Sequence, residues 1–223
     1  DGSTTYDVSD NASSILTENS ANGSVLGDAG RIATSDDAAV SLSVTDYNTL
    51  ESLGVSIANG FNLEDEASNL ASAESSVLDG AGGLTATDAA TVEEATTLEG
   101  ASNGGATSIA SLSDTATAVA NSSNAILGLV TGTITATGNA TVAQSKALAK
   151  FDKPVTYDVE GTVADIVSAL EGEDGTAQAG INNAVALSAT DAATVAQANT
   201  LQGASNDGST TYDVSDNASS ILT

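Results

Sequence analysis

The side chains best suited to chemistry in this sequence are carboxylates that lie in or beside predicted turns. Carboxylate and carbonyl oxygens in loops are the ligands that Ca²⁺ prefers, so calcium is the one cofactor that these residues suggest. The candidate ligands are Asp7, Asp10, Glu64, Asp65, Glu173, Asp174, Asp213 and Asp216. No complete EF-hand loop contains them. The alternative for Asp10 and Asp65 is helix N-capping, since a carboxylate at a helix start accepts backbone N–H bonds and faces the positive end of the helix dipole.

Catalytic residues are not predicted anywhere in the chain, and we expect that the protein is not an enzyme. The sequence contains no His and no Cys, so a Ser-His-Asp or Cys-His site has no base and a zinc or iron site has no preferred ligand. Two carboxylates could act as a glycosidase pair. Aromatic residues make up only 3% of the chain, however, which leaves almost no platform for a sugar ring.

The net charge of −26, from 30 acidic and four basic residues, restricts the partners that the surface can bind. Phosphate groups of nucleic acids and anionic lipids bind to Lys and Arg, so neither partner is expected. The longest apolar run, residues 125–130, is far shorter than the roughly 20 residues that cross a bilayer, so we expect no membrane insertion.

The chain repeats itself at its two ends. Residues 1–17, DGSTTYDVSDNASSILT, return unchanged as residues 207–223, an offset of 206 residues. A segment that opens and closes on one string resembles a window cut from a longer tandem array. We therefore predict one super-repeat over residues 1–206 and the start of the next, identical one over residues 207–223.

Two patterns alternate between these ends. The first is a short strand, an acidic turn and a helix start, with copies at Tyr6, Phe61, Ala110, Tyr157 and Tyr212, spaced by 55, 49, 47 and 55 residues. The second is a short alternating strand followed by a helix, with copies that begin at Leu42, Leu84, Ile134 and Leu187. Both patterns place a strand before a helix.

The helices of the second pattern have recognisable ends and faces. Thr87 or Asp88, and likewise Thr190 or Asp191, are the predicted N-caps. The residues Val92, Ala95 and Leu98 then fall on one helical face, as do Val195, Ala198 and Leu201. Gly100 and Gly203 are the predicted helix stops.

Strands are predicted to begin near residues 4, 40, 60, 84, 109, 133, 155, 185 and 210, and strand triplets such as Val40, Leu42 and Val44 alternate with polar residues. The acidic, Gly-containing stretches 18–37 and 171–183 are predicted as longer loops. Sequential strands joined by a helix run parallel with right-handed crossovers. The predicted fold is therefore α/β, a right-handed parallel β-α solenoid with about 26 residues per strand-helix coil and roughly eight coils per 206-residue super-repeat.

The phrases TYDVSDNASSIL and ATDAATVAQANTL resemble the alternating repeats of giant secreted or cell-surface bacterial proteins, including cyanobacterial and hemolysin-like proteins exported by the type I route. The resemblance covers nearly the whole chain and implies the extended part of an adhesin, a surface layer or a fibre. Hemolysin-like relatives often carry the calcium-binding nonapeptide GGxGxDxxx. The stretch from Gly82 to Asp88 lacks its third glycine and the right aspartate position, so that calcium role is not carried over.

Two functions follow as expectations. The first is a structural repeat protein, the shaft of an extracellular filament, sheath or giant surface adhesin, whose partners are copies of itself or adjacent repeats. The alternative is a calcium- or carbohydrate-binding module of a secreted surface protein, with calcium or cell-surface glycans as partners. Binding surfaces usually concentrate aromatic residues and Arg. Tyr6, Tyr47, Tyr157 and Tyr212 are instead scattered over repeat positions, which favours the structural function.

The calcium hypothesis predicts that calcium raises the melting temperature, because an ion that binds only the folded chain stabilises it. Thermal unfolding followed by circular dichroism in EDTA and in millimolar calcium, with magnesium as the matched control, measures the shift. An unchanged melting temperature in calcium would rule out an ordered site.

Overall fold

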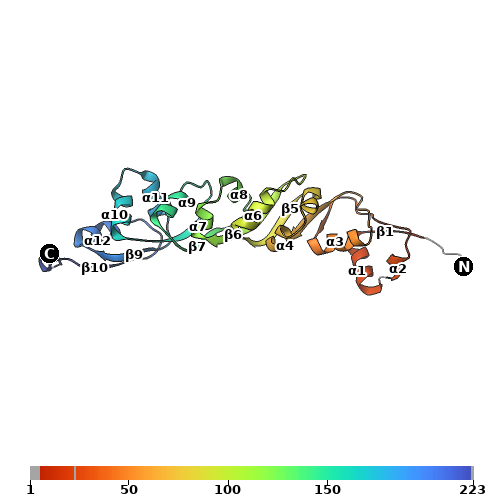
Figure 1. Cartoon of the computed structure of the whole chain (residues 1–223), viewed down its shortest axis with the longest axis horizontal. Coiled ribbons are helices and arrows are strands. Elements are labelled where there is room, and N and C mark those ends of the chain that lie inside the picture. Colours follow the sequence, from red (N-terminus) through yellow and green to blue (C-terminus); the bar gives the residue numbers. More distant parts are fainter. Residues whose placement is uncertain (1–5, 23, 222–223) are drawn as a thin grey trace. The chain divides into compact units, whose positions relative to one another are not determined.

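The computed structural model describes residues 6–22 and 24–221, and it confirms an α/β fold in which helices alternate with parallel strands. Eight strands form one parallel sheet that does not close into a barrel, and two more form a separate parallel pair (Figure 1). The strands are β1 (Asp7–Asp10), β2 (Arg31–Thr34), β3 (Val40–Leu42), β4 (Phe61–Asp65), β5 (Leu84–Ala90), β6 (Thr107–Thr115), β7 (Ile134–Ala140), β8 (Thr156–Gly161), β9 (Leu187–Ala193) and β10 (Thr210–Val214).

The helices are short and follow the strands singly or in pairs. They are α1 (Ala12–Asn22), α2 (Ser24–Gly27), α3 (Val44–Ser52), α4 (Ala67–Ala71), α5 (Ser75–Gly80), α6 (Val92–Glu99), α7 (Ala116–Ala120), α8 (Asn124–Gly128), α9 (Val142–Leu148), α10 (Val163–Glu171), α11 (Gly175–Asn182), α12 (Val195–Gln202) and α13 (Ala218–Ile221). Two helices follow β4, β6 and β8, which carry the first sequence pattern, whereas one helix follows β5, β7 and β9, which carry the second. We call each strand with its following helix or helices a step.

The chain divides into two compact parts, Asp1–Ala110 and Ser111–Thr223. In the first part β1 pairs with β2, and β3, β4 and β5 pair in chain order. The register places Leu42 beside Leu63 and Leu63 beside Leu84. These three leucines are buried, so each strand adds one large side chain to a continuous row beneath the sheet.

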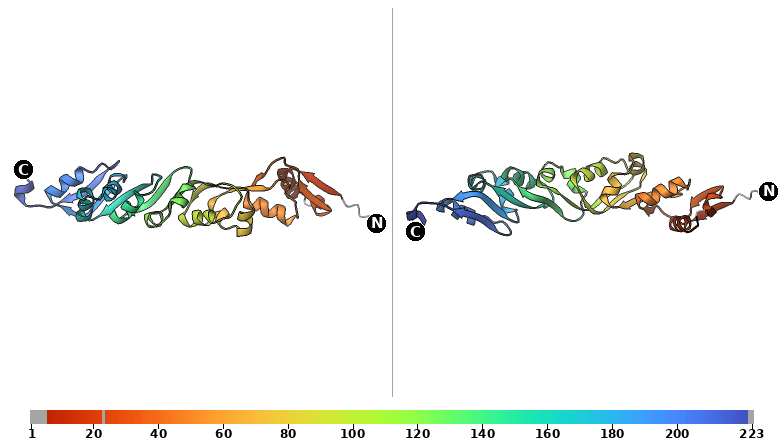
Figure 2. Two further views of the ribbon diagram at one scale, coloured as in Figure 1. Left: turned by 90° about the horizontal axis from the view of Figure 1, so that it is seen from above. Right: turned by 60° about the horizontal axis from the view of Figure 1, so that its bottom comes forward.

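In the second part the end of β6 pairs with β7, and β7 to β10 pair in chain order. The register again aligns buried side chains, with Leu112 beside Ile134 and Val159 beside Leu187. Helices α9, α10 and α11 lie on one side of β7 and β9 in both sets of views (Figures 1 and 2). The opposite strand face keeps its side chains exposed, as the alternating burial of β8 shows. Buried Tyr157 donates its hydroxyl to the Gly180 carbonyl at 2.9 Å, and burial raises its pKa to about 12.

The helices of the second pattern start three or four residues later than predicted. Thr91 and Thr194 are their N-caps, each in a capping box with Glu94 or Gln197, and Thr141 caps α9 in the same way. Asp88 and Asp191 lie inside strands β5 and β9, so the predicted N-caps Thr87, Asp88, Thr190 and Asp191 are wrong. The predicted helical faces are confirmed in part: Ala95 and Leu98, and Ala198 and Leu201, are buried.

The strands predicted near residues 40, 60, 84, 109, 133, 155, 185 and 210 are present as β3 to β10. The start predicted near residue 4 lies outside the described residues, and β1 follows it. The prediction that Val44 lies in a strand is wrong. Ser43 accepts a hydrogen bond from the Asp46 N–H as the N-cap of α3, and the helix begins at Val44.

Both predicted long loops are wrong. Residues 18–37 contain the end of α1, helix α2 and strand β2, which forms because it has β1 to pair with. Residues 171–183 contain α11, which Asp174 caps by accepting hydrogen bonds from the Thr176 and Ala177 N–H groups. The spacing of apolar residues predicts neither the pairing of a strand with a distant strand nor a helix cap within an acidic stretch.

The leucine row predicts that Leu84→Ala lowers the free energy of unfolding by about 2–5 kcal/mol, since Leu84 is completely buried and its truncation leaves a cavity. Thr87→Ala, on the exposed face of the same strand, is the matched control and should change it by less than about 1 kcal/mol. Urea unfolding followed by circular dichroism measures both variants. Equal effects of the two substitutions would contradict the assigned strand faces.

Candidate functional site

The most regular polar feature of the structure is a carboxylate that joins consecutive steps. In each case an Asp in or just after one strand accepts a hydrogen bond from the first N–H of the helix in the preceding step, 21 to 28 residues earlier. The pairs are Ala12 with Asp36 (3.0 Å), Val44 with Asp65 (3.0 Å), Ala67 with Asp88 (2.7 Å), Val163 with Asp191 (2.6 Å) and Val195 with Asp216 (3.1 Å). We call these five aspartates the bridging carboxylates.

The bridging carboxylates complete the hydrogen bonding of the helix N-termini. The first N–H groups of a helix have no partner within it. In α12 the Thr194 hydroxyl accepts from the Gln197 N–H and the Gln197 side chain accepts from the Thr194 N–H, which leaves the Val195 N–H to Asp216. An ionised acceptor makes a stronger hydrogen bond than a neutral one. Its negative charge also interacts favourably with the positive end of the helix dipole.

The hydrogen bonds hold two of these carboxylates in their ionised form. Burial acts to raise the pKa of Asp65, but hydrogen bonds from Asn69, Val44 and Glu66 outweigh it and lower that pKa. The pKa of Asp216 is lowered chiefly by the Val195 N–H and then by Asn217. Because the pKa of each carboxyl group is lower in the folded chain, ionisation of either aspartate stabilises the folded state.

The structure places the predicted calcium ligands at separate points along the chain. Asp65 and Asp216 are bridging carboxylates, and Asp10 accepts from the Asn11 N–H at 2.7 Å. The side chains of Asp7, Glu64, Glu173 and Asp213 are exposed. Within residues 6–22 and 24–221, no group of three His, Cys, Asp or Glu side chains is placed to hold a metal ion. Calcium binding stays a prediction.

The capping alternative for Asp10 and Asp65 has a different geometry from the one expected. Asn11, not Asp10, caps α1, because its side-chain oxygen accepts from the Ser14 N–H at 2.9 Å. Asp65 caps the preceding helix α3 with one oxygen while its other oxygen accepts from the Glu66 N–H. The carboxylate of one step therefore holds the helix of another.

The bridging position is occupied by glycine in β7 and β8. Gly138 in ITATGNAT replaces the aspartate of LTATDAAT, and Gly161 in YDVEGT stands where FNLEDE has Asp65. A Cβ atom at Gly161 would come within 2.9 Å of Val142 Cγ2 at the start of α9. The side chains of Val142 and Ile166 thus lie where the Cβ atom of an aspartate at position 161 would be.

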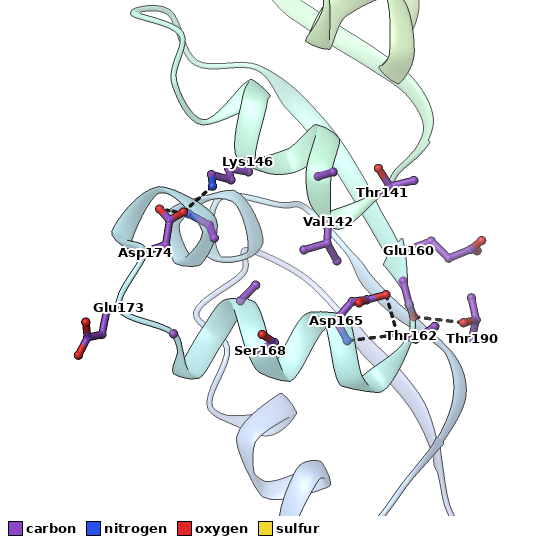
Figure 3. A pocket seen from close by; sticks show the side chains of 15 residues that line it. Thr141, Val142, Lys146, Glu160, Thr162, Asp165, Ser168, Glu173, Asp174 and Thr190 are labelled. Atoms are coloured by element: carbon purple, nitrogen blue, oxygen red, sulfur yellow. Dashed lines mark hydrogen bonds and ion pairs between the residues drawn. The ribbon is translucent and has the colours of Figure 1, made fainter.

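A groove of about 780 Å³ opens beside Gly161, between α9, α10 and α11 (Figure 3). Lys146 and Asp174 pair across one end at 2.5 Å, which lowers the pKa of Asp174 together with the hydrogen bonds that Asp174 accepts from α11. At the other end, the Thr162 hydroxyl donates to Asp165 at 2.7 Å and the Thr190 hydroxyl donates to the Gly161 carbonyl.

The side chains of this groove are poorly suited to binding a ligand. The side chains of Lys146 and Asp174 are 40% and 46% exposed, and exposed ion pairs contribute little. Glu173 points away from Lys146, so the predicted pair Glu173 and Asp174 does not converge on one point (Figure 3). The residues that line the groove include no aromatic side chain on which a sugar could stack.

Comparison of the chain with known protein families, with curated proteins and with solved structures gives no match. In the part of the chain that the structure describes, no helix has the length and apolar character needed to cross a membrane.

Sequence reasoning missed the bridging role of Asp36, Asp88 and Asp191. The available signal was the recurrence of an aspartate at the end of successive strands, about one step after each helix start. Local rules assign such a residue to the helix that follows it. The partner N–H lies in the preceding helix, which only the stacking of steps brings close.

Asp88→Ala is expected to lower the free energy of unfolding by about 1 kcal/mol, because the Ala67 N–H loses its acceptor and α4 loses a favourable charge. Asp88→Asn keeps an acceptor and should lose less. Glu64→Ala removes one negative charge from an exposed strand position and is the charge control. Urea unfolding measures all three, and an Asp88→Ala effect no larger than that of Glu64→Ala would contradict the bridging role.

The lowered pKa of Asp65 predicts a pH dependence. Its ionised form favours folding, so its stabilising contribution is present above the ordinary Asp pKa of about 3.9 and disappears as the pH falls through the lower pKa of the folded state. The difference in melting temperature between the native chain and Asp65→Asn should be constant near neutral pH and shrink below about pH 4. A difference that grows on acidification would contradict the assigned sign.

Proposed function

We propose that this chain is a segment of a structural protein, the shaft of an extracellular filament, sheath or giant surface adhesin, and that it self-associates by stacking of repeats. Its steps continue as a right-handed parallel β-α solenoid with about 26 residues per coil and roughly eight coils per 206-residue block. The right-handed crossover is the form that nearly all parallel strand–helix–strand connections take.

The observation that carries this proposal is the nearest-neighbour character of the contacts. Each strand with a described pairing is hydrogen-bonded to strands beside it in the chain order, and each bridging carboxylate reaches the helix of the preceding step. A fold in which each step contacts its neighbours can be lengthened by adding steps without rebuilding a central core. That property suits a shaft.

The surface composition supports the same function. A net charge of −26 keeps long chains soluble and resists non-specific association. The outer positions of β5 carry the small side chains of Thr85, Thr87 and Ala89. The resemblance of the two sequence phrases to exported bacterial repeats supports a location outside the cell.

The proposal is tested by electron microscopy of chains with one, two and three fused copies of the 206-residue block, each ending in residues 207–223. A solenoid shaft gives particles of constant width whose length grows by the same increment for each block. Beads on a string, or particles that widen as blocks are added, would contradict a continuous shaft.

A further inference from the structure

The step of β7 and α9 lacks the carboxylate bridges that hold the starts of α10 and α12. Gly138 stands at the bridging position of β7, and Gly161 stands at that of β8. Within the described residues, no acceptor therefore faces the first N–H of α7, at Ala116, or the first N–H of α9, at Val142. The β7–α9 step thus has no bridging carboxylate on its preceding side or on its following side.

The lysines of the chain gather in the same step. Its helix and the loop after it read TVAQSKALAKFDKPV over residues 141–155, and the equivalent residues 194–208 read TVAQANTLQGASNDG. The two helices begin with the same four residues and the same capping box. The β7–α9 step then contains three of the four basic residues of the chain, Lys146, Lys150 and Lys153. The difference in charge between the two steps lies in these lysines.

Lys153 reaches back to the preceding step. Its ammonium group donates to the carbonyl of Gly128, at 3.0 Å, and to that of Val130, at the C-terminal end of α8. Beside it, the Asp152 N–H donates to the side-chain oxygen of Asn124 at 3.2 Å. A cation is favourable near the last carbonyls of a helix, which have no partner within the helix. Lys153 therefore ties the loop of this step to α8, on the side where the aspartate of β7 is missing.

Neutral contacts complete the preceding side. The Gln144 side chain donates to the Thr117 hydroxyl of α7 at 2.8 Å. Strand β7 pairs with the end of β6, where Ile134 lies beside Leu112. Lys153 thus supplies to this side the charge-assisted contact that an aspartate supplies to α10 and α12.

The following side is held by a lysine and by close packing. Lys146 pairs with Asp174 at the start of α11 (Figure 3), and both side chains are partly exposed, so water weakens the pair. The backbones of α9 and α11 approach closely, because a Cβ atom at Gly180 would lie 2.7 Å from the Lys146 backbone nitrogen. The third lysine, Lys150, is exposed, and its ammonium group has no hydrogen bond or ion pair to the described residues.

We propose that the β7–α9 step is a joint that opens before the β8–α10–α11 step after it, and that Lys153 keeps this joint closed on its preceding side. Local opening costs least where the fewest hydrogen bonds and the least covered contacts are broken. Opening this step breaks exposed lysine contacts and leaves no bridging carboxylate to break, whereas opening the next step separates Val163 from Asp191. The joint is a property of residues 111–223 and does not depend on the proposed shaft.

Amide hydrogen exchange of the full native chain, read residue by residue by NMR, tests the order of opening. Ser145 in α9 and Ile166 in α10 are a matched pair. Both are completely buried, both are the fourth residue of their helix, and both donate to the carbonyl of a threonine N-cap. Relative to the rate of each amide in an unstructured peptide, Ser145 should be protected at least about fivefold less than Ile166, the factor expected for a missing helix cap.

Two lysine variants test what closes the joint, because Lys153→Ala and Lys150→Ala remove the same charge from the same loop. Lys153→Ala also removes the contacts to α8, so exchange at Ser145 and at Leu127 of α8 should be about two- to fivefold faster, while Ile166 keeps its native rate. Lys150→Ala should change the exchange at Ser145 and Leu127 by less than about twofold, because the ammonium group of Lys150 is exposed.

Protection at Ser145 equal to or greater than that at Ile166 in the native chain would overturn the joint. Faster exchange at Ser145 and Leu127 that is equal in the two lysine variants would show that the charge of the loop, and not the contact with α8, closes the step. That result would overturn the role of Lys153. Native rates at Ser145 and Leu127 in Lys153→Ala would overturn it as well.

Discussion

The hydrogen bond from the first N–H of a helix to an aspartate one step later is the interaction on which the order of the steps depends. The helices are short, many of them less than three turns, and helices of that length are marginal alone in water. Each therefore needs its N-terminus satisfied and its apolar face covered by neighbours. In α1, α3, α4, α10 and α12 a bridging carboxylate satisfies the first N–H, and the aligned Leu, Ile and Val side chains of adjacent strands help to cover the apolar faces.

These two interactions make different demands on the sequence. The buried row tolerates exchange among Leu, Ile and Val, because the sheet register places whatever side chain is present against its neighbours. The bridge needs a carboxylate in or just after the strand, and at Gly161, where no carboxylate is present, the Val142 and Ile166 side chains lie close to the glycine instead. Repeats can therefore drift in most positions while the strand ends stay recognisable.

The sequence predicted the α/β fold and nearly all described strands because local alternation of Val and Leu with polar residues determines which segments are extended. It failed for β2 and α11, whose formation depends on the pairing with β1 and on the cap by Asp174. The aspartates were recognised as capping residues, but their helix was misassigned, since the Ala67 N–H that Asp88 binds lies 21 residues away. The groove beside Gly161 had no signal in the sequence, because it arises from three helices that meet only in the folded chain.

The most direct test of the account is amide hydrogen exchange at the first residues of α10 and α12 in the Asp191→Ala variant. If the starts of α10 and α12 are each held by an aspartate of the next step, the Val163 amide exchanges faster in the variant, because its acceptor is gone, while the Val195 amide, held by Asp216, keeps its native rate. An unchanged Val163 rate, or equal acceleration at both amides, would contradict the claim that consecutive steps are joined by individual carboxylates.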